Sequence, residues 1–181
     1  MAKASDQEII SYLGEHLPYE LLMLRYTRSL INRDQQFLDW NAFYESFAVH
    51  ARNLYHFFID RDGRKNMTIT AMTSGFDLSR PIHIDIIINK LNEQVVHKGK
   101  SRAKIPLEKI DITIAEQIFD WLESRVSPFE QTIKLEYRSH WRPELSDLSR
   151  ISKSTQLPGL SHPTTSTTPS TYSGVLFTPT P

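Results

Sequence analysis

The residues best suited to chemistry are a histidine and two basic side chains near the middle of the chain. Lys90 precedes His97 by seven residues, and Arg102 follows five residues after it. At about 100° per helical residue, Lys90 and His97 share one face. Imidazole serves as a general acid or base, and a cation stabilises charge developing on a phosphate. The spacing suggests a catalytic set of His97, Lys90 and Arg102, although a polar face of this kind is usually the solvent-facing side.

A second basic pair, Arg52 and His56, lies one helical turn apart. Two such side chains on one face could bind a phosphate, and we treat them as candidate phosphate-binding residues. The alternative interpretation is a solvated polar face, because charged positions of an amphipathic helix usually point to water.

Metal chemistry is the third option for the histidines. His50 with Glu45 and His97 with Glu93 are the candidate ligand pairs. Neither pair has the Glu-x-x-His spacing of metal-binding helical bundles, so we predict no metal site. His50 lies at the edge of an aromatic stripe, where a half-buried, hydrogen-bonded histidine is expected.

Other motifs with a known mechanism are absent. The chain has only six glycines, with no glycine-rich phosphate loop, no GxSxG, no HExxH and no EF-hand loop. We therefore predict no cofactor.

The amino-acid composition excludes several further classes of protein. The 181 residues include 21 basic and 21 acidic side chains and no cysteine. A net charge of zero argues against a dedicated nucleic-acid wrapper, and the lack of cysteine excludes disulfides and thiolate metal sites. No apolar run is long enough to span a membrane, and no signal peptide is visible, so we expect a cytoplasmic protein.

A change in composition divides the chain. Residues 154–181 contain no Asp, Glu, Lys or Arg and hold five of the ten prolines. Such a segment buries too little apolar surface to offset its ordering entropy. We predict a helical domain over residues 1–150 and a disordered Ser/Thr/Pro-rich tail over 151–181.

Capping signals and periodicity predict the first helices. Ser5 and Glu8 form a capping box for a short helix ending at Gly14, and Pro18 opens the next helix, over 19–32. A third helix is expected from Asp39 or Asn41 to Ile59. Its apolar stripe is centred on Phe43, Phe47, Ala51, Leu54 and Phe58 and is widened by Tyr44, Ala48 and Tyr55.

The second half is less regular. Residues 64–80 are expected to form an extended loop, although 67–72 have strand propensity. Helical spacing of isoleucines predicts a helix over 81–98. A further helix begins with the capping box at Thr113, and Pro128 should break or kink it near Ser127, with a restart toward Glu136.

Together these segments predict an all-α fold, an up-and-down four-helix bundle with a short N-terminal helix. The predicted core comprises Leu21, Leu24, Phe43, Phe47, Leu54, Phe58, Ile84, Ile88, Leu91, Ile114, Ile118 and Leu122.

Two segments of the chain resemble helices of known protein families. The segment from Glu45 to Leu54 reads ESFAVHARNL, and Ile88 to His97 reads INKLNEQVVH. They look like two helices of a group of uncharacterised bacterial helical proteins, and the second resembles the last-helix motif of HEPN domains. That family motif is an Arg followed a few positions on by His, and paired sites across a dimer cleft cleave RNA without metal. Here His97 matches the motif histidine, but the motif arginine is not matched. Lys90, seven positions upstream, is the nearest basic residue, and Arg52 to His56 has a shorter spacing than the motif.

Two functions follow as hypotheses. The first is a non-enzymatic helical module that binds a protein partner, or itself as a homodimer through the helices at 19–32 and 41–59. The second, implied by the resemblance, is a metal-independent HEPN-like RNase or degenerate relative acting on RNA in bacterial stress or phage defence. Neither hypothesis involves a membrane.

Overall fold

The computed structural model describes residues 4–31, 37–59, 68–91 and 112–149, and the regular elements in these ranges are helices. They contain no strand, only an isolated antiparallel bridge between Thr73 and Ile133. The order is α1 (Asp6–Ser11), the π-helix η1 (Tyr12–His16), α2 (Leu17–Ile31), α3 (Phe37–Phe58), α4 (Ile69–Met72), α5 (Ile82–Leu91), α6 (Ile112–Thr132), and the 3-10 helices η4 (Arg138–His140) and η5 (Pro143–Ser146). The predicted all-α class is confirmed for these ranges, whereas the predicted tail lies outside them.

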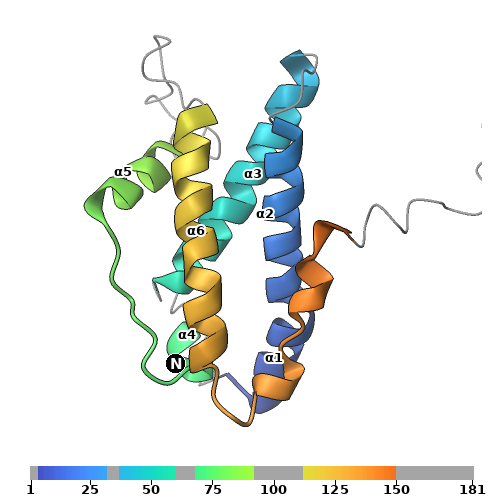
Figure 1. The fold of residues 1–181 in the computed structure, drawn as a ribbon, viewed down its shortest axis with the longest axis vertical. Coiled ribbons are helices and arrows are strands. Elements are labelled where there is room, and N and C mark those ends of the chain that lie inside the picture. The colour runs from blue at the N-terminus through green and yellow to red at the C-terminus, as the bar shows by residue number, and fades with distance from the viewer. Residues whose placement is uncertain (1–3, 32–36, 60–67, 92–111, 150–181) are drawn as a thin grey trace, which may run out of the picture.

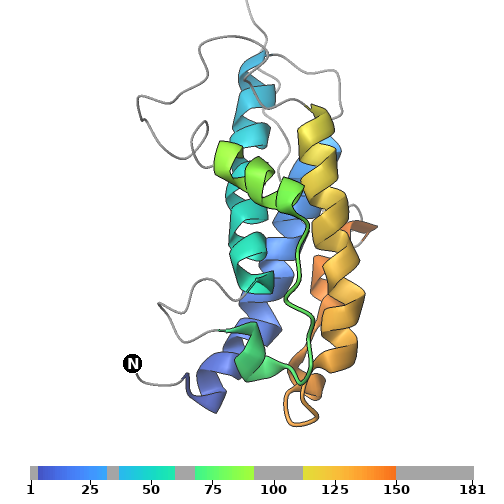
Figure 2. The same ribbon diagram turned by 90° about the vertical axis from the view of Figure 1, so that its left-hand side faces the viewer.

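Three long helices, α2, α3 and α6, lie side by side (Figures 1 and 2). In Figure 1, α2 runs upward, and α3 and α6 run downward. The short α5 lies across the upper part of this group, packed against α3 and α6. After α6 the chain turns back, and η5 packs on α2, which is therefore covered by α3, α6 and η5.

The N-terminal capping box is confirmed. The Ser5 hydroxyl accepts a hydrogen bond from the Glu8 amide at 3.3 Å, and the Glu8 carboxylate accepts one from the Ser5 amide at 2.8 Å. The Ser5 amide hydrogen bond lowers the pKa of Glu8 from its usual value. Local sequence therefore sets the start of α1.

The predicted helix end at Gly14 is wrong. The chain continues through η1, which contains Gly14, directly into α2. Leu13 and Leu17, on either side, are fully buried. Continuing the helix keeps both leucines in the core, and this burial outweighs the modest helix penalty of one glycine.

The predicted stripe of α3 is largely confirmed. Phe47, Ala51, Leu54 and Phe58 are buried, as are the flanking Tyr44, Ala48 and Tyr55, whereas Phe43 is half-buried. The helix begins at Phe37, upstream of the predicted caps. Asp39 and Asn41 therefore lie inside α3 and do not cap it. Both residue types carry only a small penalty within a helix, so the helix can include them.

The predicted extended loop over 64–80 is wrong in its middle. Residues 69–72 form α4, whose N-cap Thr68 accepts a hydrogen bond from the Ala71 amide at 3.3 Å. Ile69 and Met72 are fully buried, and a single helical turn places both in the core. Residues 76–81 follow without regular structure, and 64–67 lie outside the described residues.

The predicted helix over 81–98 is confirmed from Ile82 to Leu91, and its remainder lies outside the described residues. Of the predicted break or kink near Ser127, the break does not occur, because α6 continues past Pro128 to Thr132. Pro128 cannot donate to the carbonyl four residues earlier. The next residue, Phe129, is 1% exposed, and its burial offsets the lost hydrogen bond.

Ten of the twelve predicted core residues are buried, and Phe43 and Ile114 are half-buried against the core. An aromatic cluster at the lower end of the bundle centres on Phe129. Its ring meets Phe57, Phe58, Phe76 and Trp141 at centroid distances from 5.4 to 6.4 Å. These contacts fix the end of α6 against α3 and the segment before α5.

A nearly buried cation, Arg125, lies beside this cluster. Its guanidinium carbon is 4.6 Å from the centroid of the Phe76 ring and 5.8 Å from that of Trp121. Nη1 lies 4.0 Å from a carboxylate oxygen of Asp77, which is 68% exposed. Burial lowers the pKa of Arg125, and its Nε and Nη2 are buried without hydrogen-bond partners. Stacking on rings, not ion pairing, therefore holds this side chain.

We expect Arg125→Met to leave the free energy of unfolding unchanged or to raise it, measured by urea denaturation. Methionine keeps the packing of the long side chain and removes the desolvation penalty of a buried charge. Arg125→Ala should lower that free energy by about 1 kcal/mol, because the ring contacts are lost. Equal losses in both variants would show that the charge itself stabilises this region.

Candidate functional site

The predicted catalytic set is only partly within the described residues. Lys90 lies on α5 and is half-buried, whereas His97 and Arg102 fall in residues 92–111, outside the described ranges. The structure thus places one member of the predicted set, on the short helix that crosses α3.

The candidate phosphate-binding residues Arg52 and His56 lie one turn apart on α3, and both are half-buried. The His56 ring meets the edge of the Tyr55 ring at 5.4 Å. Within the described residues, Arg52 forms no hydrogen bond or ion pair, and its Nε is buried. An incoming anion would find this guanidinium unneutralised.

Other described arginines are engaged. Their partners are carboxylates, carbonyls, a hydroxyl or aromatic rings, as seen for Arg25, Arg28, Arg80, Arg125, Arg138 and Arg142. Arg52 differs from these arginines because its guanidinium has no such partner among the described residues.

His50 has a partner that the sequence did not indicate. Its Nδ1 lies 2.7 Å from a carboxylate oxygen of Glu20 on α2, and Asn53 donates to the same carboxylate at 3.2 Å. The predicted hydrogen bond of this histidine is therefore confirmed, and His50 is buried rather than half-buried. The pairing spans 30 residues and depends on how α2 packs on α3, so no local motif could have revealed Glu20.

This Glu20–His50 pair is poorly placed for catalysis. A carboxylate that fixes one imidazole nitrogen is a common arrangement in active sites. However, the His50 side chain is only 11% exposed, and the Tyr19 ring lies edge-on at 5.8 Å. The pair joins two helices, and we assign it a structural role.

A second polar contact joins α3 to α5. The Tyr55 hydroxyl donates to an Asp85 carboxylate oxygen, and Arg80 Nε donates to that same oxygen at 2.7 Å. Tyr55 is fully buried, and its ring also meets Trp121 of α6 at 5.8 Å. This network fixes the rotation of α5, and so determines which of its side chains face outward.

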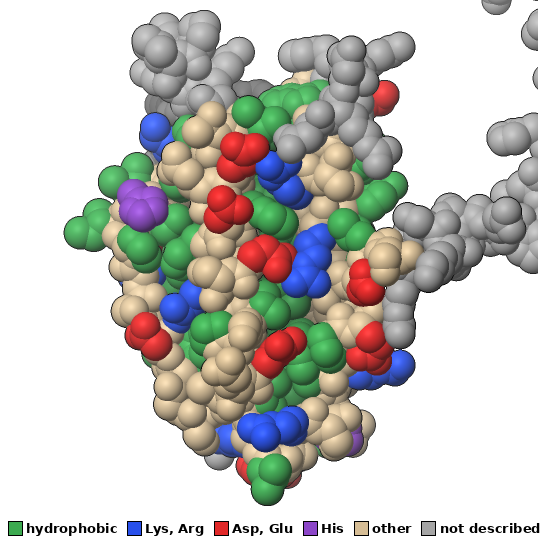
Figure 3. Space-filling view, viewed as in Figure 1, with side chains coloured by type: hydrophobic (Ala, Val, Ile, Leu, Met, Phe, Trp, Pro, Cys, Tyr) green, Lys and Arg blue, Asp and Glu red, His purple; other side chains and the backbone are tan. Residues whose placement is uncertain are grey.

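The outward side of α5, here called the outer face, consists of Ile82, His83, Ile86, Asn89 and Lys90. Ile82 is 79% exposed and Ile86 52%, one helical turn apart. Figure 3 shows hydrophobic side chains gathered at the left of the molecule, around an exposed histidine of this region. The opposite side of the helix, formed by Ile84, Ile87, Ile88 and Leu91, is buried. The outer face is thus an apolar patch on a helix that is already anchored.

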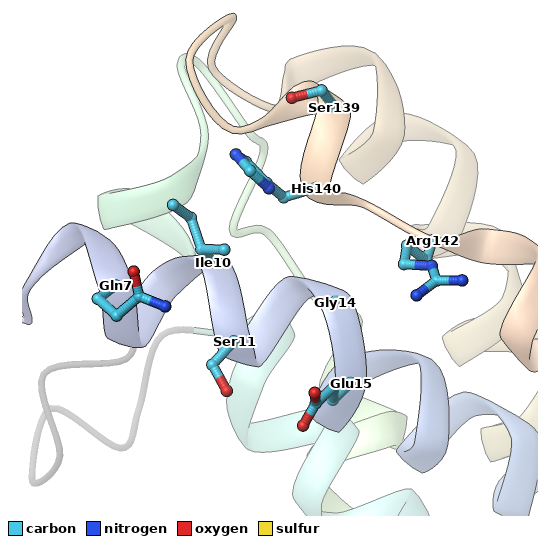
Figure 4. A pocket seen from close by; sticks show the side chains of 8 residues that line it. All are labelled: Gln7, Ile10, Ser11, Gly14, Glu15, Ser139, His140 and Arg142. Atoms are coloured by element: carbon cyan, nitrogen blue, oxygen red, sulfur yellow. The ribbon is translucent and has the colours of Figure 1, made fainter.

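A pocket of about 280 Å³ lies at the other end of the molecule, where η1 faces η4. Figure 4 shows the side chains that line it: Gln7, Ile10, Ser11, Glu15, Ser139, His140 and Arg142, with Gly14 at its floor. A Cβ on Gly14 would lie 3.6 Å from the His140 carbonyl oxygen, so the two backbones approach closely there. Arg142 already contacts Glu144 at 3.1 Å. Polar and apolar surface line the pocket in similar measure, and none of the lining side chains has a buried polar atom without a partner among the described residues.

Two further features, a metal site and a membrane span, are absent from the described residues. No three His, Asp or Glu side chains among them gather as they would around a metal ion. None of the described helices combines the length and the apolar character required of a membrane span.

Comparison with known proteins identifies no relative of this chain. No family model, curated protein or solved structure matches the chain. The function therefore has to be inferred from the arrangement of the side chains alone.

Proposed function

We propose that this chain is a non-enzymatic helical module that binds another protein through the outer face of α5. The single observation that carries the proposal is the exposure of Ile82 and Ile86 one turn apart. Complete burial of an exposed isoleucine side chain stabilises a protein by roughly 1.5–3 kcal/mol. Ile82 and Ile86 leave much of this stabilisation unused while they remain in water. Both also carry the modest helix penalty of β-branched residues.

The rest of the helix supports this function. Tyr55 and Arg80 hold Asp85, and the buried isoleucines fix the other side, so the outer face is presented by a rigid element. A preorganised apolar helix face loses little conformational entropy when a partner binds it. The α2–α3 faces that the sequence suggested for a homodimer are largely buried inside the molecule.

Position-specific photo-crosslinking tests the proposal. A photoreactive amino acid at position 82 of the full chain, in cells that naturally express it, should give a discrete heavier adduct. The same group at the exposed Gln117 on α6 serves as the matched control and should give none. Ile86→Glu should abolish the adduct, because a carboxylate would then sit in an apolar interface.

Folding has to be verified in the same experiment. Ile86 is half exposed, so Ile86→Glu should shift the free energy of unfolding by only about 0.5 kcal/mol. A folded Ile86→Glu variant that retains the adduct would contradict the proposed function, as would equal crosslinking from positions 82 and 117.

A second candidate, the HEPN-like RNase, is favoured by one observation, the unneutralised guanidinium of Arg52 one turn from His56. We propose that α2, α3, α5 and α6 correspond to the four helices of a HEPN-like bundle, in which α5 leads toward His97. In this hypothesis His97 moves the proton, and Lys90, Arg102 or Arg52 stabilises phosphate charge.

The RNase hypothesis predicts metal-independent cleavage of RNA by the purified full chain. His97→Ala should reduce the rate by about 10²–10⁴-fold, as expected for loss of a general acid or base. The free energy of unfolding serves as the control for a folding defect. Intact RNA after incubation with the wild-type chain, or cleavage that survives His97→Ala, would exclude this candidate.

A further inference from the structure

The charges around the outer face of α5 indicate the chemistry of its partner. Lys90 lies in the last turn of the helix and forms no ion pair within the described part of the chain. His83 lies one residue after Ile82 and is exposed. Because seven residues nearly complete two helical turns, His83 and Lys90 lie on the same flank of the isoleucines.

The acidic side chain of α5 is already occupied. Asp85 accepts hydrogen bonds from Tyr55 and Arg80 on the flank that faces α3. The outer face therefore presents two isoleucines with His83 and Lys90 on one flank, and α5 itself carries no acidic side chain other than Asp85.

A second copy of the chain fits this face poorly. In an antiparallel pairing of two α5 helices, the Lys90 end of one helix would meet the Arg80–Asp85 ion pair of the other, which leaves no free carboxylate on α5 for Lys90. In a parallel pairing, Lys90 would face Lys90, and like charges brought together in this way disfavour association.

We propose that the outer face of α5 docks an acidic amphipathic helix of a partner protein; this rests on the proposed function above. Apolar side chains of the partner pack on Ile82 and Ile86, and a partner carboxylate pairs with Lys90. Helix-in-groove recognition uses apolar anchors spaced one turn apart, and a charge at the rim sets orientation and specificity.

A pair of peptide probes tests this preference. Both are short helical peptides with leucines at i, i+3 and i+4 spacing, and the remaining positions are glutamate in one and lysine in the other. Titrated into the isotope-labelled full chain, the leucine–glutamate peptide should shift the amide signals of Ile82, Ile86 and Lys90. The leucine–lysine peptide should not shift them.

Variants define the contacts. Lys90→Glu should weaken binding of the leucine–glutamate peptide about tenfold, equal to about 1.4 kcal/mol, whereas Lys90→Arg should retain it. Binding should also weaken as salt is added, because a rim ion pair is screened. Ile86→Glu should abolish the shifts.

Several outcomes would overturn the inference. These are equal binding of both peptides, no binding of either, or shifts confined to another surface. Shifts of the same signals by a single-stranded RNA but not by the leucine–glutamate peptide would also overturn it and would indicate a nucleic-acid partner. Failure here with a positive crosslink at position 82 would leave the proposed function intact, because crosslinking does not depend on the partner's charge.

Discussion

Phe129→Ala is expected to lower the free energy of unfolding by about 3–5 kcal/mol. The ring is 1% exposed and lies among four other aromatic rings, two from α3, one from the segment before α5 and one from the segment between η4 and η5. Truncation removes the buried area and leaves a cavity that large rigid rings cannot readily fill. Urea denaturation followed by circular dichroism measures the loss.

The matched control is Leu135→Ala, a few residues further along the chain. Leu135 is 81% exposed, so its truncation should change stability by no more than about 0.5 kcal/mol. A loss below about 1 kcal/mol for Phe129→Ala would show that the aromatic cluster does not hold the end of α6.

The same residue explains why the end of α6 was not predictable. The Ser-Pro-Phe-Glu segment, residues 127–130, has a proline and a capping pattern that normally end one helix and start another. In the structure α6 continues to Thr132, because the continuous helix buries Phe129. Local signals were outweighed by a tertiary contact that depends on Phe57 and Phe76, far away in the sequence.

Features of the fold could be predicted from the sequence where local and tertiary preferences agree. The capping box at Ser5 and the stripe of α3 could be predicted, because each depends on spacing within one helix. Gly14 was misassigned for the reason that applies at Pro128: buried Leu13 and Leu17 on both sides favour a continuous path through η1.

The two sides of α5 differ in the same way: the buried side could be predicted from the sequence, and the outer face could not. Helical spacing placed Ile84, Ile88 and Leu91 on the buried side of α5, and that side is confirmed. Which side chains remain outside depends on the rotation fixed by Tyr55 and Asp85. That contact joins residues 30 positions apart, and no periodicity within α5 could reveal it.

Arg25→Ala is the second change expected to have a large effect, lowering the free energy of unfolding by about 2 kcal/mol. Its Nε and Nη2 donate to the two oxygens of Glu123 at 2.6 and 2.8 Å, and this hydrogen bonding raises the pKa of Arg25. Nη1 donates to the carbonyl and hydroxyl oxygens of Ser146 at 3.0 and 2.7 Å. One guanidinium thus connects α2, α6 and η5.

Geometry distinguishes this residue from a surface ion pair. A bidentate guanidinium–carboxylate contact is stronger than a single hydrogen bond, and lysine cannot reproduce it. Arg25→Lys should therefore recover less than half of the loss. The partly exposed side chains, 23% for Arg25 and 29% for Glu123, limit the effect through solvent screening.

Arg28→Ala provides the control, because Arg28 lies one turn away on α2 and contacts Glu116 through a single nitrogen at 2.7 Å. Its loss should cost less than about 1 kcal/mol. Hydrogen exchange adds a local readout: Arg25→Ala should accelerate exchange in η5, where Ser146 loses its donor, and Arg28→Ala should not. Equal acceleration in both variants would mean that η5 is held by its packing on α2 rather than by Arg25, and the loss of stability would then reflect only the broken contact with Glu123.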